Sequence, residues 1–164
     1  MFRLTGISQN CGGLQPGGLL TVEYLPLPYL SASAEHLVNS ENSFVGALAS
    51  IYTENWLSMQ ILLSTDREWK DSVREDEQGR FFDRTVEGSF AGSEPPTKHE
   101  INQMKQYRYL LRVRDRAGRR WLLNDPETAF KFTYSFSTGN KGTDGRKHQI
   151  KWAGQTPHEA VLWP

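Results

Sequence analysis

Arginine side chains gather over a short stretch in the second half of the sequence, around the single acid Asp115. They are Arg108, Arg112, Arg114, Arg116, Arg119 and Arg120. Guanidinium groups beside Tyr107, Tyr109 and Trp121 could grip phosphates or stack on bases. On the solvent face of a strand they would instead protect a sheet edge and pair with the acidic segment of a neighbouring copy. We favour the protein contact over direct nucleic-acid contact, because 19 basic and 19 acidic residues cancel.

A glycine-rich stretch, Thr138–Gly145, supplies the second set of candidate contact residues. Those residues are Gly139, Lys141, Gly142 and Gly145. The stretch lacks the Gly-Lys-Ser/Thr ending of a phosphate-binding loop, and no helical pattern follows it. We therefore expect an exposed loop that meets partner proteins and holds no nucleotide.

Residue types that bind metals or act as nucleophiles are too scattered in the sequence to form a recognisable centre. The four histidines, His36, His99, His148 and His158, have no second ligand at metal-binding spacing. Cys11 is the only cysteine, so neither an intrachain disulfide nor a thiolate cluster can form. These patterns predict a protein without a cofactor or a metal.

Carboxylates cluster near the middle of the chain, where Asp66, Glu68, Asp71, Glu75, Asp76 and Glu77 fall within twelve positions. A glycosidase needs two carboxylates that face each other across a sugar, and adjacency in sequence does not supply that geometry. The segment from Asp71 to Gly79 is instead expected to be a solvated loop. We predict that the protein is not an enzyme.

Exposed aromatic side chains offer an alternative function, recognition of carbohydrate or of a host surface. A binding platform of this kind would draw on Tyr24, Tyr29, Trp69 or Trp163. Burial in the core is the commoner fate of such residues.

Alternating apolar and polar residues predict that these side chains stand on short β-strands. The expected strands are residues 2–7, 19–25, 56–64, 82–90, 107–114, 121–123, 130–137, 146–152 and 160–163, with Gly154 and Pro157 separating the last two. Gly79 and Gly118 mark turns, and Gly88 marks a bulge or kink. Thr97 and Glu100 match a capping box that opens a short helix ending near Gln106.

This order of elements predicts a single, mainly β domain over residues 1–164, an antiparallel β-sandwich or partly closed barrel with one or two short helices. Flexible segments are expected near residues 8–18, 31–50 and 138–145. The first residues lack the pattern of a secretory signal, and no window approaches the roughly 20 apolar residues that span a bilayer. We therefore expect folding in a cytoplasm and no membrane contact.

The second half also carries a family resemblance. Its elements are Tyr109–Gly118, Trp121–Asn124, Phe130–Phe132, Ser137–Gly139, Ile150, Gly154 and Pro157–Leu162. In this order, over about residues 107–164, they resemble small, poorly characterised virion proteins of phages and prophages of gut Bacteroidetes. That family often has Gly where Asn124 stands, and Pro-Ala where Pro157–Ala160 stands, so the turn and the last strand depart from its pattern.

The resemblance implies a phage-like virion structural protein of the tail or the head-to-tail junction. Its expected partners are further copies of itself, in a ring joined through strand edges and loop arms, and other virion proteins. The expected location is the virion, and the host cytoplasm during assembly.

Overall fold

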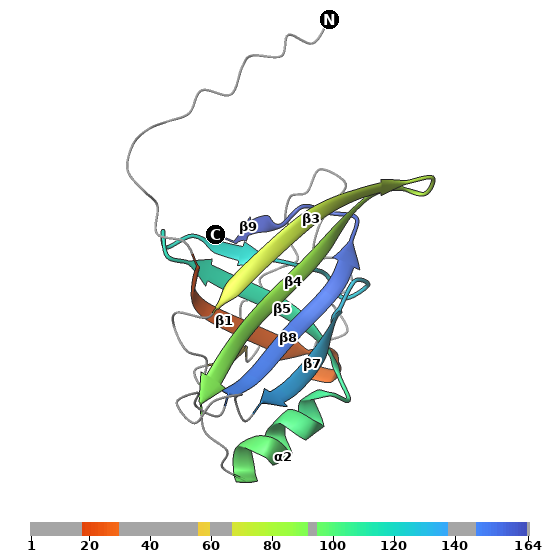
Figure 1. Cartoon of the computed structure of the whole chain (residues 1–164). Helices are drawn as coiled ribbons and strands as arrows, with labels where there is room; N and C mark the ends of the chain where they lie inside the picture. The colour runs from red at the N-terminus through yellow and green to blue at the C-terminus, as the bar shows by residue number, and fades with distance from the viewer. Residues whose placement is uncertain (1–17, 30–55, 60–66, 92–94, 138–146, 164) are drawn as a thin grey trace, which may run out of the picture.

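The computed structural model describes residues 18–29, 56–59, 67–91, 95–137 and 147–163, and nine antiparallel strands within them form one sheet (Figure 1). The strands are β1 (Leu19–Pro26), β2 (Leu57–Ser58), β3 (Glu68–Asp76), β4 (Gly79–Ala91), β5 (Arg108–Asp115), β6 (Arg120–Leu122), β7 (Phe130–Ser137), β8 (Lys147–Thr156) and β9 (Val161–Trp163). Their order is β2-β1-β5-β7-β8-β4-β3, and β6 joins β5 to β9. The sheet is not closed into a barrel, and the predicted mainly antiparallel β class is confirmed.

The sheet bends where β5 meets β7, and its two halves pack face to face. Only two residue pairs join these strands, Arg108 with Lys131 and Tyr109 with Phe130. Beyond that short seam β1 and β5 run steeply across β4 and β8 (Figure 1). Aromatic rings from strands that are not neighbours in the sheet therefore lie close together. The ring centroids of Tyr24 in β1 and Trp152 in β8 are 5.9 Å apart. One aromatic-rich core therefore lies between the halves.

Alternation explains the strands that the sequence predicts best. In β7 the buried Phe130 and Phe132 alternate with the exposed Lys131 and Thr133, as a strand with one core-facing side requires. In the β5–β6 hairpin, Gly118 adopts a φ of 87°, which an L side chain rarely tolerates. Both the predicted strand and the predicted turn are confirmed.

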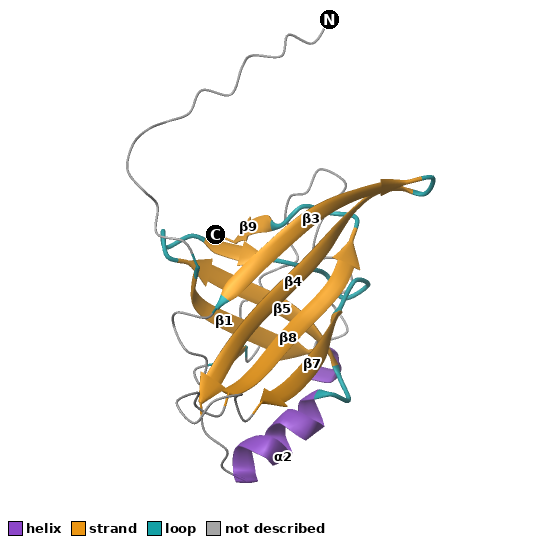
Figure 2. Cartoon of the chain, viewed as in Figure 1, coloured by secondary structure: helices purple, strands orange, loops and turns teal. Residues whose placement is uncertain are grey.

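The α-helix α2 (Pro95–Met104) lies across one end of the sheet (Figure 2). The helix begins at Pro95, so Thr97 lies within its first turn and is not the residue that caps it. The predicted capping box is therefore wrong. Proline is common at the first position of a helix. Buried Ile101 and the half-buried Met104 pack against the core. A short 3-10 helix, η1 (Leu27–Tyr29), follows β1.

Four predictions about individual segments need correction. Asp71–Gly79 is not a loop, because Glu68–Asp76 forms β3, whose nine residues all pair with β4. Gly88 makes no bulge, since it pairs regularly with Ile150. β8 continues through Gly154 to Thr156. The strand expected at 56–64 was expected to be buried, whereas the two residues of β2 are exposed, and positions 60–64 lie outside the described residues.

The remaining predictions on local structure fall on parts of the chain that the structure does not describe. They are the strand at 2–7 and nearly all of the segments expected to be flexible, at 8–18, 31–50 and 138–145. No helix among the described residues is long and apolar enough to cross a membrane.

Candidate functional site: a protruding hairpin, an arginine face and a tyrosine pocket

The β3–β4 hairpin extends beyond the body of the sheet as a two-stranded arm (Figure 1). Pairing between β4 and β8 begins at Phe82, whereas β3 and β4 continue to pair through Arg74, Glu75 and Asp76. Every residue from 70 to 80 is exposed. Exposure on both faces removes the apolar alternation that marks a strand, which is why the sequence indicated a loop.

Acidic side chains concentrate at the tip of this arm. Glu75, Asp76 and Glu77 are consecutive there, and the Asp76 carboxylate accepts a hydrogen bond of 2.8 Å from the Gln78 backbone N–H. Gly79 completes the turn with a φ of 124°. The tip therefore presents three consecutive acids on a defined backbone, with the exposed Arg74 and Arg80 beside them.

The base of the arm is fixed to the body by a buried arginine. Arg84 of β4, which is 1% exposed, binds the Asp71 carboxylate through two hydrogen bonds of 2.6 and 2.9 Å. Its guanidinium also donates to the Leu123 carbonyl and, at 3.3 Å, to the His158 carbonyl. One side chain thus links β3, β4 and two loops of the opposite half.

A second, exposed ion pair lies further along the same hairpin. Lys70 contacts Glu87 at 2.5 Å and Glu68 at 3.1 Å. Hydrogen bonds to Glu87, and then to Glu68, raise the pKa of Lys70 above its usual value. Surface pairs of this kind contribute little to stability.

The predicted arginine cluster divides into side chains with partners in the same chain and side chains without them. Arg112 forms a bidentate pair with Glu23, at 2.6 and 3.0 Å, and its guanidinium lies 4.6 Å from the centroid of the Trp56 ring. Arg119 lies 3.6 Å from the Asp115 carboxylate, and Arg116 also interacts within the chain. Arg112 is therefore a structural residue, which weakens its candidacy as a contact for another molecule.

Arg114 and Arg120 form an exposed like-charge pair. They face each other across β5 and β6, on the side of the sheet that points away from the core. Neither has a hydrogen bond or an ion pair with another described residue, and the same holds for exposed Arg108. Like charges directly opposite in a sheet are destabilising, so this pair suits an incoming anionic group. We call Arg114 and Arg120 the arginine face.

The four contact candidates of the glycine-rich stretch, Gly139, Lys141, Gly142 and Gly145, lie outside the described residues. The structure describes only the strands that flank them. Ser137 at the end of β7 pairs with Lys147 at the start of β8. The stretch thus connects a β-hairpin.

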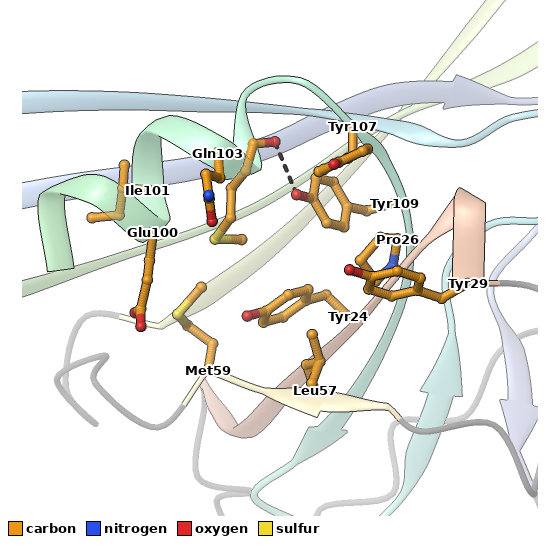
Figure 3. A pocket seen from close by; sticks show the side chains of 11 residues that line it. Tyr24, Pro26, Tyr29, Leu57, Met59, Glu100, Ile101, Gln103, Tyr107 and Tyr109 are labelled. Atoms are coloured by element: carbon orange, nitrogen blue, oxygen red, sulfur yellow. Dashed lines mark hydrogen bonds between the residues drawn. The ribbon is translucent and has the colours of Figure 1, made fainter. Parts of the chain in front are cut away.

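A pocket of about 330 Å³ opens between β1, β2, η1, α2 and β5 (Figure 3). Its lining residues are Tyr24, Pro26, Tyr29, Leu57, Met59, Glu100, Ile101, Gln103, Met104, Tyr107 and Tyr109. Tyr24 and Tyr29, two of the predicted platform aromatics, are thus brought together. Trp69 instead packs into the core, with its ring 5.8 Å from that of Trp121. The side chain of Trp163 is outside the described set.

Two phenol groups of the pocket differ in their hydrogen bonding. The Tyr109 hydroxyl donates to the Met104 carbonyl at 2.9 Å, the bond drawn in Figure 3. Burial chiefly, and then the charge of Glu100, raise the pKa of Tyr24. Within the described part of the chain the Tyr24 hydroxyl has no hydrogen-bond partner, so it is a neutral donor that a ligand can use.

The histidines of the described region serve packing and local hydrogen bonds. His148 is buried between the rings of Phe90 and Phe136, each at a centroid distance of 4.7 Å, and one of its ring nitrogens lies 2.7 Å from the Tyr134 hydroxyl. His99 contacts Gln103 on α2 at 3.1 Å. The described residues contain no group of three or more His, Cys, Asp or Glu placed to hold a metal ion.

Comparisons with family models, with curated proteins and with solved structures found no match.

Sequence reasoning missed three residues that shape these sites. Arg84 and Asp71 are far enough apart in the chain that only the pairing of β3 with β4 aligns them. Glu100 was interpreted as part of a helix cap, although an acid next to an apolar residue on a short helix is equally suited to line a pocket. The available signal was its position one residue before Ile101, the helix's buried apolar residue.

Proposed function

We propose that this protein is a non-enzymatic assembly protein, a phage-like virion component whose copies associate with one another. The observation that carries the proposal is the β3–β4 arm, which projects an acidic tip past the body of the sheet. An exposed arm without a core of its own is the kind of element that becomes ordered against a neighbour. The virion setting, in the tail or at the head-to-tail junction, is supported by the sequence resemblance alone.

Charge complementarity identifies the surface that the arm meets. Glu75, Asp76 and Glu77 at the tip match the arginine face, where two exposed guanidinium groups have no acidic partner among the described residues. β5 runs toward the opposite side of the molecule from the arm tip, so the arm does not reach its own arginine face (Figure 1). Contact between copies is therefore head to tail.

A head-to-tail contact determines the kinds of assembly that can form. Such an interface generates a ring if the rotation between copies closes and a filament if it does not. The outer edge of β3 has no strand partner among the described residues and can add backbone hydrogen bonds to the same contact. A ring of copies, with other virion proteins as further partners, is the assembly that we propose.

Replacement of the tip acids tests this function. We expect the wild-type chain to form a defined oligomer in light scattering coupled to gel filtration, and the variant Glu75→Lys/Asp76→Lys/Glu77→Lys to be a monomer. Salt should weaken the wild-type oligomer, because exposed charges are screened over about 8 Å at physiological ionic strength. Glu159→Lys, an exposed acid outside both surfaces, is the matched control.

A further inference from the structure

The tyrosine pocket has an unbalanced charge. Among the described residues that line it, Glu100 is the only acid apart from the phenols, and none is basic. Exposed Glu100 makes no ion pair with a described residue. A carboxylate at the wall of a largely apolar pocket attracts a positive group.

The aromatic walls favour the same kind of ligand. The Tyr24 and Tyr109 rings stand nearly perpendicular, at 76° with centroids 5.6 Å apart, and so form a corner. Tyr29 and Tyr107 are 63% and 40% exposed, which is unusual for side chains of this size. Electron-rich ring faces gathered around one space bind ammonium and guanidinium groups through cation–π attraction.

From these observations we propose that the pocket binds an organic cation, an alkylammonium or guanidinium group, held against the tyrosine rings beside Glu100. Met59 and Met104 supply polarisable walls that adapt to methyl or methylene groups. The Tyr24 hydroxyl can donate to a polar atom next to the cationic centre. Such a group reaches the pocket either as a small molecule or as the side chain of a basic peptide.

This binding does not depend on the proposed assembly. α2, which carries Glu100, lies at the far end of the sheet from the tip of the β3–β4 arm (Figure 1). A variant of the pocket should leave the oligomer unchanged, and a variant of the tip should leave cation binding unchanged. An experiment can therefore contradict either proposal without contradicting the other.

Calorimetric titration of the full chain with choline tests the inference, with 3,3-dimethylbutan-1-ol as the uncharged probe of the same shape. We expect choline to bind at least roughly tenfold more tightly than the neutral alcohol, since only choline gains the cation–π attraction. A trimethyllysine-containing peptide, titrated in parallel, distinguishes a peptide source from a free small molecule according to which binds more tightly. Equal affinity for choline and the alcohol, or no binding of either cationic probe, overturns the proposal.

Variants locate the binding in the pocket. Glu100→Gln should weaken choline binding by roughly tenfold, and Tyr29→Ala should weaken it by roughly fivefold, whereas Tyr29→Phe, which keeps the ring, should bind as the wild type does. Glu159→Gln is the control for the loss of one surface charge. Choline affinity unchanged in both Glu100→Gln and Tyr29→Ala, or preferential binding of a neutral saccharide such as N-acetylglucosamine, contradicts the proposal. An unaltered circular dichroism spectrum shows that each variant is folded.

Discussion

Arg84 shows how a single buried charge can hold an exposed arm in place. Its guanidinium is fully buried, whereas the carboxylate that it pairs with, on Asp71, is 30% exposed. A buried charge that loses its partner is strongly destabilising, because the desolvated ion remains without compensation. The orientation of the arm thus depends on one side chain in the body of the sheet.

Removal of the countercharge should reveal this dependence. We expect Asp71→Asn to lower the free energy of unfolding by about 2–3 kcal/mol, less than for a fully buried pair because Asp71 is partly hydrated. Glu68→Gln, which breaks an exposed pair with Lys70, should have a much smaller effect on the free energy of unfolding. Urea unfolding measures both. Equal effects of the two substitutions would contradict a structural role for Arg84.

The buried phenol of Tyr109 predicts a dependence of stability on alkaline pH. Burial, followed by the neighbouring phenols, raises the pKa of Tyr109 well above its ordinary value, whereas in the unfolded chain the group ionises near pH 10. From about pH 10 upward the unfolded state loses a proton that the native state keeps, so stability falls as pH rises toward the folded-state pKa. At lower pH this contribution to stability is fully present.

Unfolding free energies measured between about pH 8 and pH 11 test whether Tyr109 causes this loss of stability. Tyr109→Phe should lower stability at pH 8 by about 1 kcal/mol, since the Met104 carbonyl loses its donor. The same variant should also show a shallower alkaline decline than the wild type. An identical decline in both proteins would show that Tyr109 does not cause it.

At the scale of the element, β8 depends on a close approach between a glycine and an aromatic ring. A Cβ atom added to Gly154 would lie 2.5 Å from the Phe130 ring of β7. The ring covers the position that a side chain would otherwise fill, and so the strand passes through the glycine without a break. The sequence suggested the opposite, because glycine inside a strand pattern commonly marks an end or a bulge.

Addition of the missing methyl group tests that packing. Gly154→Ala should lower the free energy of unfolding by about 1–3 kcal/mol through overpacking against Phe130. In the double variant Gly154→Ala/Phe130→Leu the smaller side chain makes room, so its destabilisation should be less than the sum of the single effects. Additive effects in denaturant unfolding would mean that the contact is not the cause.

Elements were predictable from sequence where one face is buried, and unpredictable where that condition fails. β7 and the β5–β6 hairpin follow from alternation and from Gly118. β3 could not be predicted in this way, because an arm that is exposed on both faces shows no alternation of apolar and polar residues. Residues of the candidate sites were predictable as types, as with the arginines and Tyr24, but their partners depend on strand register. Register brings Arg112 to Glu23 and leaves Arg114 facing Arg120.

For the whole molecule, the distribution of charge matters more than its sum. The net formal charge is zero, yet the acids of the tip and the unpaired arginines lie on separate surfaces. That separation disfavours a contact within one copy and favours one between copies. Opposite charges across such an interface mainly set the orientation and the rate of association.

The most direct test of the central claim mixes two charge-reversed proteins, one with Glu75→Lys/Asp76→Lys/Glu77→Lys and the other with Arg114→Glu/Arg120→Glu. Each variant alone should be a monomer in light scattering coupled to gel filtration. In the mixture the acidic tip of one protein meets the arginine face of the other, and the lysine tip meets the glutamate-substituted face, so an equimolar mixture should regain the oligomer that each variant alone has lost. A mixture that remains monomeric, or either variant that assembles as the wild type does, would contradict docking of the acidic tip on the arginine face.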